Sequence, residues 1–188
     1  MLADILKNDR TMKQISILIF LFSTLFSCNN TNEVKQIIGK KFFVYDAIDY
    51  YKTDFDESKI GELFDNISKS EIDSFKMEII LGNIPNSITD LTFIQKLEEV
   101  GYKKTTVDTS KFEGIDKIFI EKTTSENIYA ACIHVYRDIL IFKKEGQVVG
   151  TAKICFDCLA NQITGTTANT KNFGQDGDYG KLARILRQ

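Results

Sequence analysis

The sequence has a single proline, no tryptophan and a single histidine, His134. A Ser-His-Asp triad would therefore have to use His134, and the chain contains no Gly-x-Ser-x-Gly nucleophile elbow. It also contains no phosphate-binding glycine loop. The formal net charge of −2 provides no basic field, so we expect no nucleic-acid partner. These absences disfavour triad hydrolases, P-loop enzymes and nucleic-acid-binding proteins.

A short basic segment followed by an apolar run lies near the N-terminus. Met12 and Lys13 precede the apolar residues 15–26, which is the pattern of a secretory signal peptide. The run is shorter than the roughly 20 residues that a transmembrane helix needs. We therefore expect residues 1–27 to be a signal peptide. Because residues 1–11 are unusual in front of such a signal, Met12 is the candidate start and residues 1–11 are a mis-called extension.

The leader ends in Leu25-Phe26-Ser27-Cys28 and is followed by a polar stretch. Leu25, Ser27 and Cys28 resemble the lipobox of bacterial lipoproteins, in which a peptidase cuts just before a cysteine that carries a diacylglyceryl group. Phe26 stands where a small residue is common. The resemblance implies a lipid on Cys28, a lipidated tether over residues 28–36, and a cell-envelope protein held on a membrane by its anchor. The alternative is a plain secretory signal in which Cys28 plays no part.

We expect residues 37–188 to form a single α+β domain. The spacing of apolar residues predicts its helices and strands. Helices are predicted over residues 56–67 and 89–100, where apolar side chains recur at helical spacing, and from Asp178 onward. The predicted strands are residues 73–81, 103–107 and 116–122, followed by a hairpin over residues 132–158 and a loop over residues 160–172. This order favours an antiparallel sheet with the helices packed on one face. The face of the first helix is formed by Ile60, Leu63, Phe64 and Ile67.

The predicted hairpin contains three of the four cysteines and the only histidine of the chain. Two runs rich in isoleucine, valine and aromatic residues flank a short polar segment with one glycine. If Lys143 pairs with Gln147 across a three-residue turn, Cys132 falls opposite Cys158. Residues opposite each other in an antiparallel pair are close enough for a disulfide. The register therefore predicts a Cys132–Cys158 bond and leaves Cys155 as the odd thiol.

Several arrangements of these cysteines remain open. A disulfide suits the oxidising envelope, and Cys132–Cys155 and Cys155–Cys158 are alternative pairings. Cys132, His134, Cys155 and Cys158 also form a Cys₃His set of the kind that binds tetrahedral zinc, although Cys-x-His on a strand is an unusual half-site. A thiol-redox role of the Cys155-x-x-Cys158 pair is the third possibility.

The hairpin resembles a group of bacterial envelope proteins with a Cys…Ile-Cys-Phe-x-Cys pattern. The residues that carry this resemblance are Cys132, Gly146, Val148, Val149, Ile154, Cys155, Phe156 and Cys158. The resemblance implies an envelope location and no particular activity. We therefore expect a lipoprotein with a non-enzymatic binding or structural role, no cofactor, and a protein or small-molecule partner of unknown identity. The alternative is a metal-binding or thiol-redox protein that uses the cysteine cluster.

Overall fold

The computed structural model describes residues 39–82, 84–123 and 132–188. The predicted signal peptide and tether, with Cys28, lie outside the described residues. The strands are β1 (Ala47–Lys52), β2 (Lys103–Thr106), β3 (Asp138–Lys144), β4 (Gln147–Cys155) and β5 (Ala160–Thr164). The helices are α2 (Ile60–Asp65), α3 (Glu71–Ile80), α4 (Thr92–Lys96), α5 (Phe112–Asp116) and α6 (Asp178–Arg187), with short 3₁₀ helices η2 (Glu57–Lys59) and η3 (Thr109–Lys111).

The strands form one five-stranded sheet in the order β2-β1-β3-β4-β5, and every neighbouring pair is antiparallel. The predicted α+β class with an antiparallel sheet is therefore confirmed. The central strand β3 contains four consecutive fully buried residues, Ile139, Leu140, Ile141 and Phe142. Because successive side chains of a strand point to opposite faces, burial of all four requires cover on both sides of the sheet.

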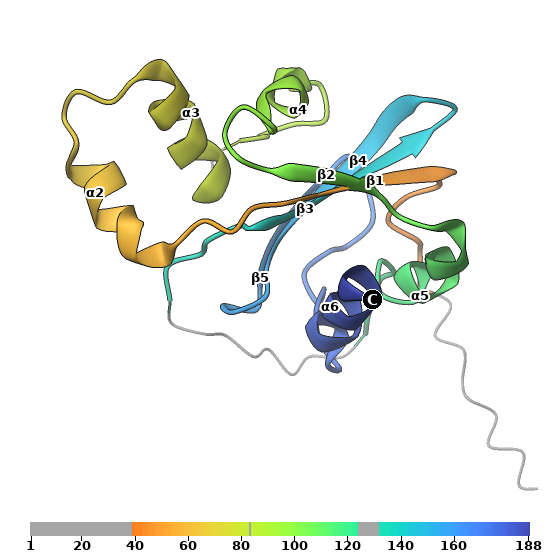
Figure 1. The fold of residues 1–188 in the computed structure, drawn as a ribbon. Coiled ribbons are helices and arrows are strands. Elements are labelled where there is room, and N and C mark those ends of the chain that lie inside the picture. Colours follow the sequence, from red (N-terminus) through yellow and green to blue (C-terminus); the bar gives the residue numbers. More distant parts are fainter. Residues whose placement is uncertain (1–38, 83, 124–131) are drawn as a thin grey trace, which may run out of the picture. The chain divides into compact units, whose positions relative to one another are not determined.

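Helices supply that cover on both faces, which differs from the expected one-sided arrangement. Leu140 and Phe142 pack with Ile115 of α5 and Leu182 of α6. Ile139 and Ile141 pack with Ile79 of α3 and with Phe93 and Leu97 of α4 and its C-cap. Figure 1 shows α3 and α4 on one side of the sheet and α5 and α6 on the other. The physical reason is the uninterrupted apolar run of β3, which is typical of a strand buried on both faces.

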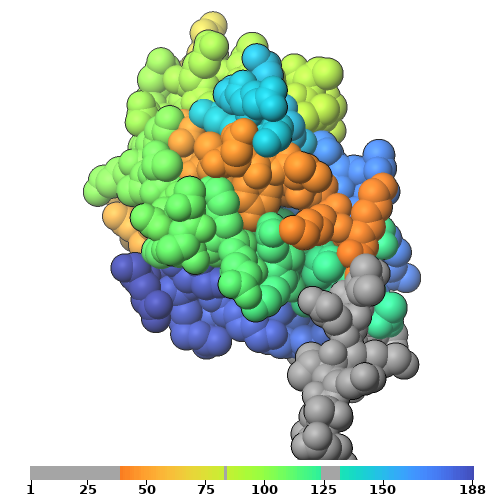
Figure 2. Space-filling view, turned by 90° about the vertical axis from the view of Figure 1, so that its right-hand side faces the viewer, coloured from red at the N-terminus to blue at the C-terminus, as the bar shows by residue number. Residues whose placement is uncertain are grey.

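The surface view shows how the N- and C-terminal parts of the described region meet. In Figure 2 residues 39–52, in orange, lie between the segment around β2 and α5, in green, and the rest of the sheet, while the blue C-terminal segment lies below the green one. The antiparallel pairing of β1 with β2 and the close approach of Gly114 in α5 to Ile185 in α6 agree with this arrangement. The C-terminal helix is therefore part of the domain core.

The β3–β4 hairpin exists, but its register and extent differ from the prediction. Lys144 pairs with Gln147, so the turn has two residues, Glu145 and Gly146, with φ of 50° and 78°. Positive φ at both positions is what a type I′ turn requires. The register then shifts next to Lys143, and β3 begins only at Asp138. Cys132 is therefore not part of the hairpin, and the predicted pairing of Lys143 with Gln147 is wrong.

Residues 73–81 were predicted as a strand, but they belong to helix α3. The Ser70 hydroxyl accepts a hydrogen bond from the Asp73 backbone N–H at 3.1 Å, which caps the helix N-terminus. Phe75 and Ile79, which suggested alternation, also fit the helical spacing of four residues. Helix α3 buries Ile79 against the sheet and Ile80 against Ile60 of α2 and Val135. The cap and this packing decide between the two patterns.

Two further predictions of local structure are wrong. Residues 116–122 do not form a strand: α5 ends at Asp116, and only Ile120 makes a β-bridge, with Lys41. Residues 160–172 are not all loop, because residues 160–164 form strand β5 along β4. In both places contacts with distant parts of the chain decide the structure, and such contacts cannot be inferred from local residue preferences.

The remaining predicted elements form with shorter limits. Residues 103–106 form the predicted strand β2, and the predicted last helix forms as α6, in which Asp178, expected as the cap, is the first helical residue and Gly177 is the N-cap. Gly101, with φ of 96°, follows the helical segment that buries Phe93, Leu97 and Val100. The expected apolar face of α2 is buried only at Ile60, whereas Phe64 and Ile67 are exposed.

Candidate functional site

The structure joins Cys132 and Cys158 in a disulfide, with their Cα atoms 6.0 Å apart. Cys158 lies in the turn between β4 and β5, and Cys132 lies six residues before β3. This is the predicted pair, although the chain brings the two residues together without the predicted hairpin register. The bond ties the chain entering the central strand to the end of β4.

Cys155, the odd cysteine, is free and buried. It packs in a small apolar cluster with Tyr136 and Cys158. His134 is exposed, with its ring 6.2 Å from the ring of Tyr136. Within residues 39–82, 84–123 and 132–188, no group of three or more His, Cys, Asp or Glu side chains is arranged to hold a metal ion. The proposed Cys₃His set is therefore not assembled in this structure.

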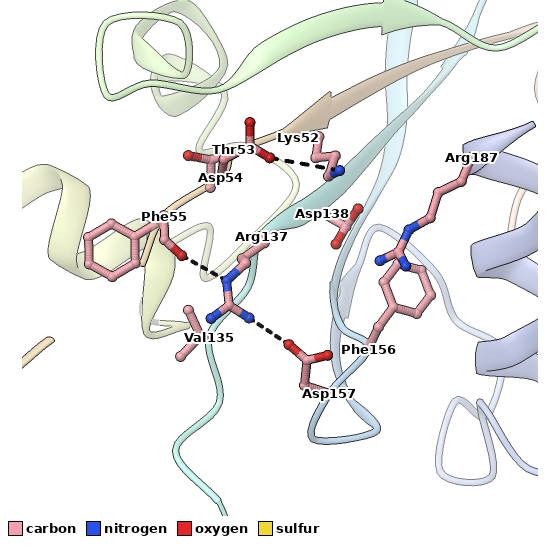
Figure 3. A pocket seen from close by; sticks show the side chains of 10 residues that line it. All are labelled: Lys52, Thr53, Asp54, Phe55, Val135, Arg137, Asp138, Phe156, Asp157 and Arg187. Atoms are coloured by element: carbon pink, nitrogen blue, oxygen red, sulfur yellow. Dashed lines mark hydrogen bonds and ion pairs between the residues drawn. The ribbon is translucent and has the colours of Figure 1, made fainter. Parts of the chain in front are cut away.

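A pocket of about 320 Å³ lies where β1 ends and β3 begins, beside the last turn of α6 (Figure 3). Four stretches of the chain contribute to it: the end of β1 and the residues after it, the start of β3, the β4–β5 turn, and the end of α6. It is lined by residues 52–55 and by Val135, Arg137, Asp138, Phe156, Asp157 and Arg187.

Arg137 holds three of these stretches together. Its Nε donates to the Phe55 carbonyl at 2.9 Å, and its terminal nitrogens contact Asp157 at 2.7 Å and Glu57 at 3.2 Å. The guanidinium is thus occupied by protein groups on all sides, as its planar set of donors permits. Arg137 therefore fixes the wall of the pocket rather than offering a free charge to it.

Asp138 forms the buried acidic part of the pocket, and only 3% of its surface is exposed. Its Oδ1 accepts a hydrogen bond from the Tyr50 hydroxyl, and no donor among the described residues reaches Oδ2. Burial raises the pKa of Asp138 above its usual value, and the Tyr50 bond and the positive charges of Arg187 and Lys52 oppose this only in part. The pKa of Tyr50 is also raised, by burial and by this carboxylate, so the phenol stays protonated and keeps donating.

Two cations stand at the opening of the pocket. Lys52 is the cross-strand neighbour of Asp138, and its Nζ lies 3.8 Å from the exposed carboxylate of Asp54. The Arg187 guanidinium lies over the Phe156 ring at 5.1 Å and makes no ion pair within the described part of the chain. In Figure 3 the Asp138 carboxylate lies between the Arg137 and Arg187 side chains. The pocket thus has a buried carboxylate, an apolar wall, and an outer part where Lys52 and Arg187 stand beside the exposed carboxylates of Asp54 and Asp157.

No sequence motif connects the residues of this pocket, so the sequence alone does not predict it. The one local signal is Asp138 itself, a carboxylate placed directly before the apolar run of residues 139–142. A charged residue at the start of a buried strand is unusual enough to mark a candidate site. The partners of Asp138 come from sequence positions as distant as Tyr50, with a separation of 88 residues.

Comparisons with protein-family models, with curated proteins and with solved structures found no significant match for this chain. Among the helices that the structure describes, none is both long and apolar enough to cross a membrane.

Proposed function

We propose that this protein is a lipoprotein of the bacterial cell envelope, anchored to a membrane through a lipid on Cys28, whose α+β domain binds a partner without performing chemistry. The anchor rests on the lipobox-like residues Leu25, Ser27 and Cys28. The observation that carries the proposal is the pairing of Cys132 with Cys158. Disulfides persist in oxidising compartments and are rare in the reducing cytosol, so the pair supports export.

The binding role is supported by the pocket at the end of α6. A cavity with an apolar wall and a few convergent charged groups is the usual form of a small-molecule site. Phe55 and Phe156 supply apolar surface, while Asp138, Lys52 and Arg187 supply charge of both signs. The pocket is present in the chain without a ligand, and its lining comes from two strand ends, a turn and the end of α6.

A thiol-redox function is the second candidate, and the placement of Cys155 favours it. Residues 156–159 form the turn between β4 and β5, and Cys155, at the end of β4, packs in one buried cluster with Cys158. Cys158 therefore has a free thiol packed in the same cluster as well as its disulfide partner Cys132. Attack of the Cys155 thiolate on the Cys158 sulfur would form a Cys155–Cys158 bond and release Cys132 as a thiolate. A zinc site made of Cys132, His134, Cys155 and Cys158 would require that the Cys132–Cys158 disulfide first be reduced.

The anchor is tested by a Cys28→Ser variant of the full chain in a bacterial host supplied with labelled palmitate. We expect wild-type protein in the membrane fraction with the label, and the variant unlabelled and either released or left as an uncut precursor. The reason is that only a cysteine thiol can accept the diacylglyceryl group. Ser27→Ala, which keeps a small residue beside Cys28, is the matched control and should behave as wild type. A Cys28→Ser protein that stays labelled and membrane-bound would refute the anchor.

A further inference from the structure

We propose that the pocket beside α6 binds a small zwitterion of the free amino-acid class, with its ammonium group on Asp138 and its carboxylate between Arg187 and Lys52. This inference names the ligand class for the binding role proposed above and rests on that role. It depends on the arrangement of charges: the buried carboxylate of Asp138 lies beside two more exposed cations, Lys52 and Arg187.

The inner end of the pocket calls for a cation or a hydrogen-bond donor. Asp138 is almost wholly buried, and its Oδ1 is already occupied by the Tyr50 hydroxyl. Among the described residues only the Tyr50 hydroxyl donates to this carboxylate, and its Oδ2 is open to the cavity that the side chain lines rather than sealed from solvent. Arg187 and Lys52 act on this carboxylate through their charges, but neither forms an ion pair with it among the described residues, so an ammonium group placed against Oδ2 supplies a direct donor and a close opposite charge.

The outer end of the pocket calls for an anion. Arg187 has no ion-pair partner within the described residues, and the Lys52 ammonium has only the distant contact with Asp54 at 3.8 Å. The third cation, Arg137, is already engaged by Asp157 and Glu57. Two available cations on the same rim suit a carboxylate, because a guanidinium offers it two parallel donors.

The apolar wall of the pocket suits a short ligand with an apolar side chain. Phe55, Val135 and Phe156 line the cavity. Its volume of about 320 Å³ lies at the lower end of the range for small-molecule sites. A ligand that carried only an anion would satisfy Arg187 and leave Asp138 without a partner. A ligand that carried only a cation would leave the rim unused. An α-amino acid carries both charged groups on one carbon atom and so presents them side by side.

The test is calorimetric titration of the full-length protein in detergent with three probes that differ by one charge each. L-leucine carries both charges, N-acetyl-L-leucine lacks the ammonium, and L-leucinamide lacks the carboxylate. We expect L-leucine to bind, and each analogue to bind roughly tenfold more weakly or worse, as is usual when one member of a buried charged pair is lost. Equal binding of N-acetyl-L-leucine, or no binding of any probe, would overturn the proposal.

Variants assign each charge to its residue. Asp138→Asn should weaken L-leucine binding and leave N-acetyl-L-leucine binding unchanged, because that probe has no ammonium to lose. Arg187→Gln should likewise weaken L-leucine and leave L-leucinamide unchanged. Arg184→Gln, on the same helix but outside the pocket, is the matched control and should bind as wild type. Loss of all three probes by equal factors in either variant would contradict the assignment.

These results are independent of the membrane anchor. Binding is measured on extracted protein, so a failure to bind refutes the ligand assignment and leaves the fractionation of Cys28→Ser as a separate test of the anchor. If Asp138→Asn does not fold, the three probes on wild-type protein still decide between a zwitterion and an anion.

Discussion

The free energy of unfolding should rise by about 2 kcal/mol between pH 7 and pH 9, and a Lys153→Met variant should lose that rise. Lys153 lies on β4 and is fully buried. Its ammonium group donates to the Ile84 carbonyl at 2.6 Å and lies 4.9 Å from the centre of the Tyr136 ring. No carboxylate within the described residues pairs with it. Burial therefore lowers the pKa of Lys153 to about 7.

The direction of this effect follows from proton linkage. Between the folded pKa, about 7, and the ordinary value of 10.5, the unfolded chain binds a proton on this lysine that the folded chain does not. Protonation therefore favours unfolding, so stability increases as the pH rises through this window. The rise is best measured below about pH 10, because the buried phenols of Tyr45, Tyr50 and Tyr102 have raised pKa values and favour unfolding at higher pH.

The measurement is chemical denaturation at several pH values for wild type, Lys153→Met and Lys117→Met. Methionine keeps most of the apolar volume of lysine and removes the charge, so Lys153→Met should flatten the profile and be the more stable protein at pH 7. Lys117, which is exposed and paired with Glu113, is the control, and its variant should keep the wild-type slope. Parallel profiles for all three proteins would show that Lys153 is not held neutral by burial.

Removal of the disulfide should cost on the order of 3 kcal/mol of unfolding free energy, as expected for a bond that closes a loop of this length. The bond joins residues 26 positions apart, and it stabilises the fold mainly by reducing the conformational entropy of the unfolded chain. A double variant, Cys132→Ala with Cys158→Ala, should unfold at a lower temperature than wild type, and reductant should lower wild type to a similar value.

The same experiment separates a disulfide from a metal site. Reductant should not affect the double variant, and a chelator should not affect wild type. Cys155→Ala is the matched control, because it removes the free thiol and keeps the bond, so it should still respond to reductant. Destabilisation of wild type by a chelator, with no response to reductant, would contradict the disulfide and support the zinc alternative.

The cysteine pair shows how far the sequence could predict the site. Cys132 and Cys158 were paired by assuming a continuous hairpin, yet β3 begins at Asp138, and the actual turn has two residues. The predicted Cys132–Cys158 pair is nevertheless present, because the start of β3 and the end of β4 lie side by side. The register itself was not predictable, since a bulge beside Lys143 shifts it.

Helix α3 and strand β5 show why part of the fold could not be predicted. Phe75 and Ile79 satisfy both an alternating and a helical pattern, and the Ser70 cap, which favours the helix, was overlooked. Strand β5 has a mixed, half-buried composition, and it is specified mainly by its pairing with β4. The pocket was beyond local patterns altogether, because Lys52, Asp138 and Arg187 come together only once the sheet and α6 have packed.

The most direct test of the proposed lipid-anchored, disulfide-bonded protein is the intact mass of wild-type chain extracted from membranes without reductant and alkylated after unfolding. We predict a chain that begins at Cys28, carries the mass of its lipid, and takes up one alkyl group, at Cys155. A lipid-free chain that retains residues 1–27, or a chain that alkylates at Cys132, Cys155 and Cys158, would contradict the account.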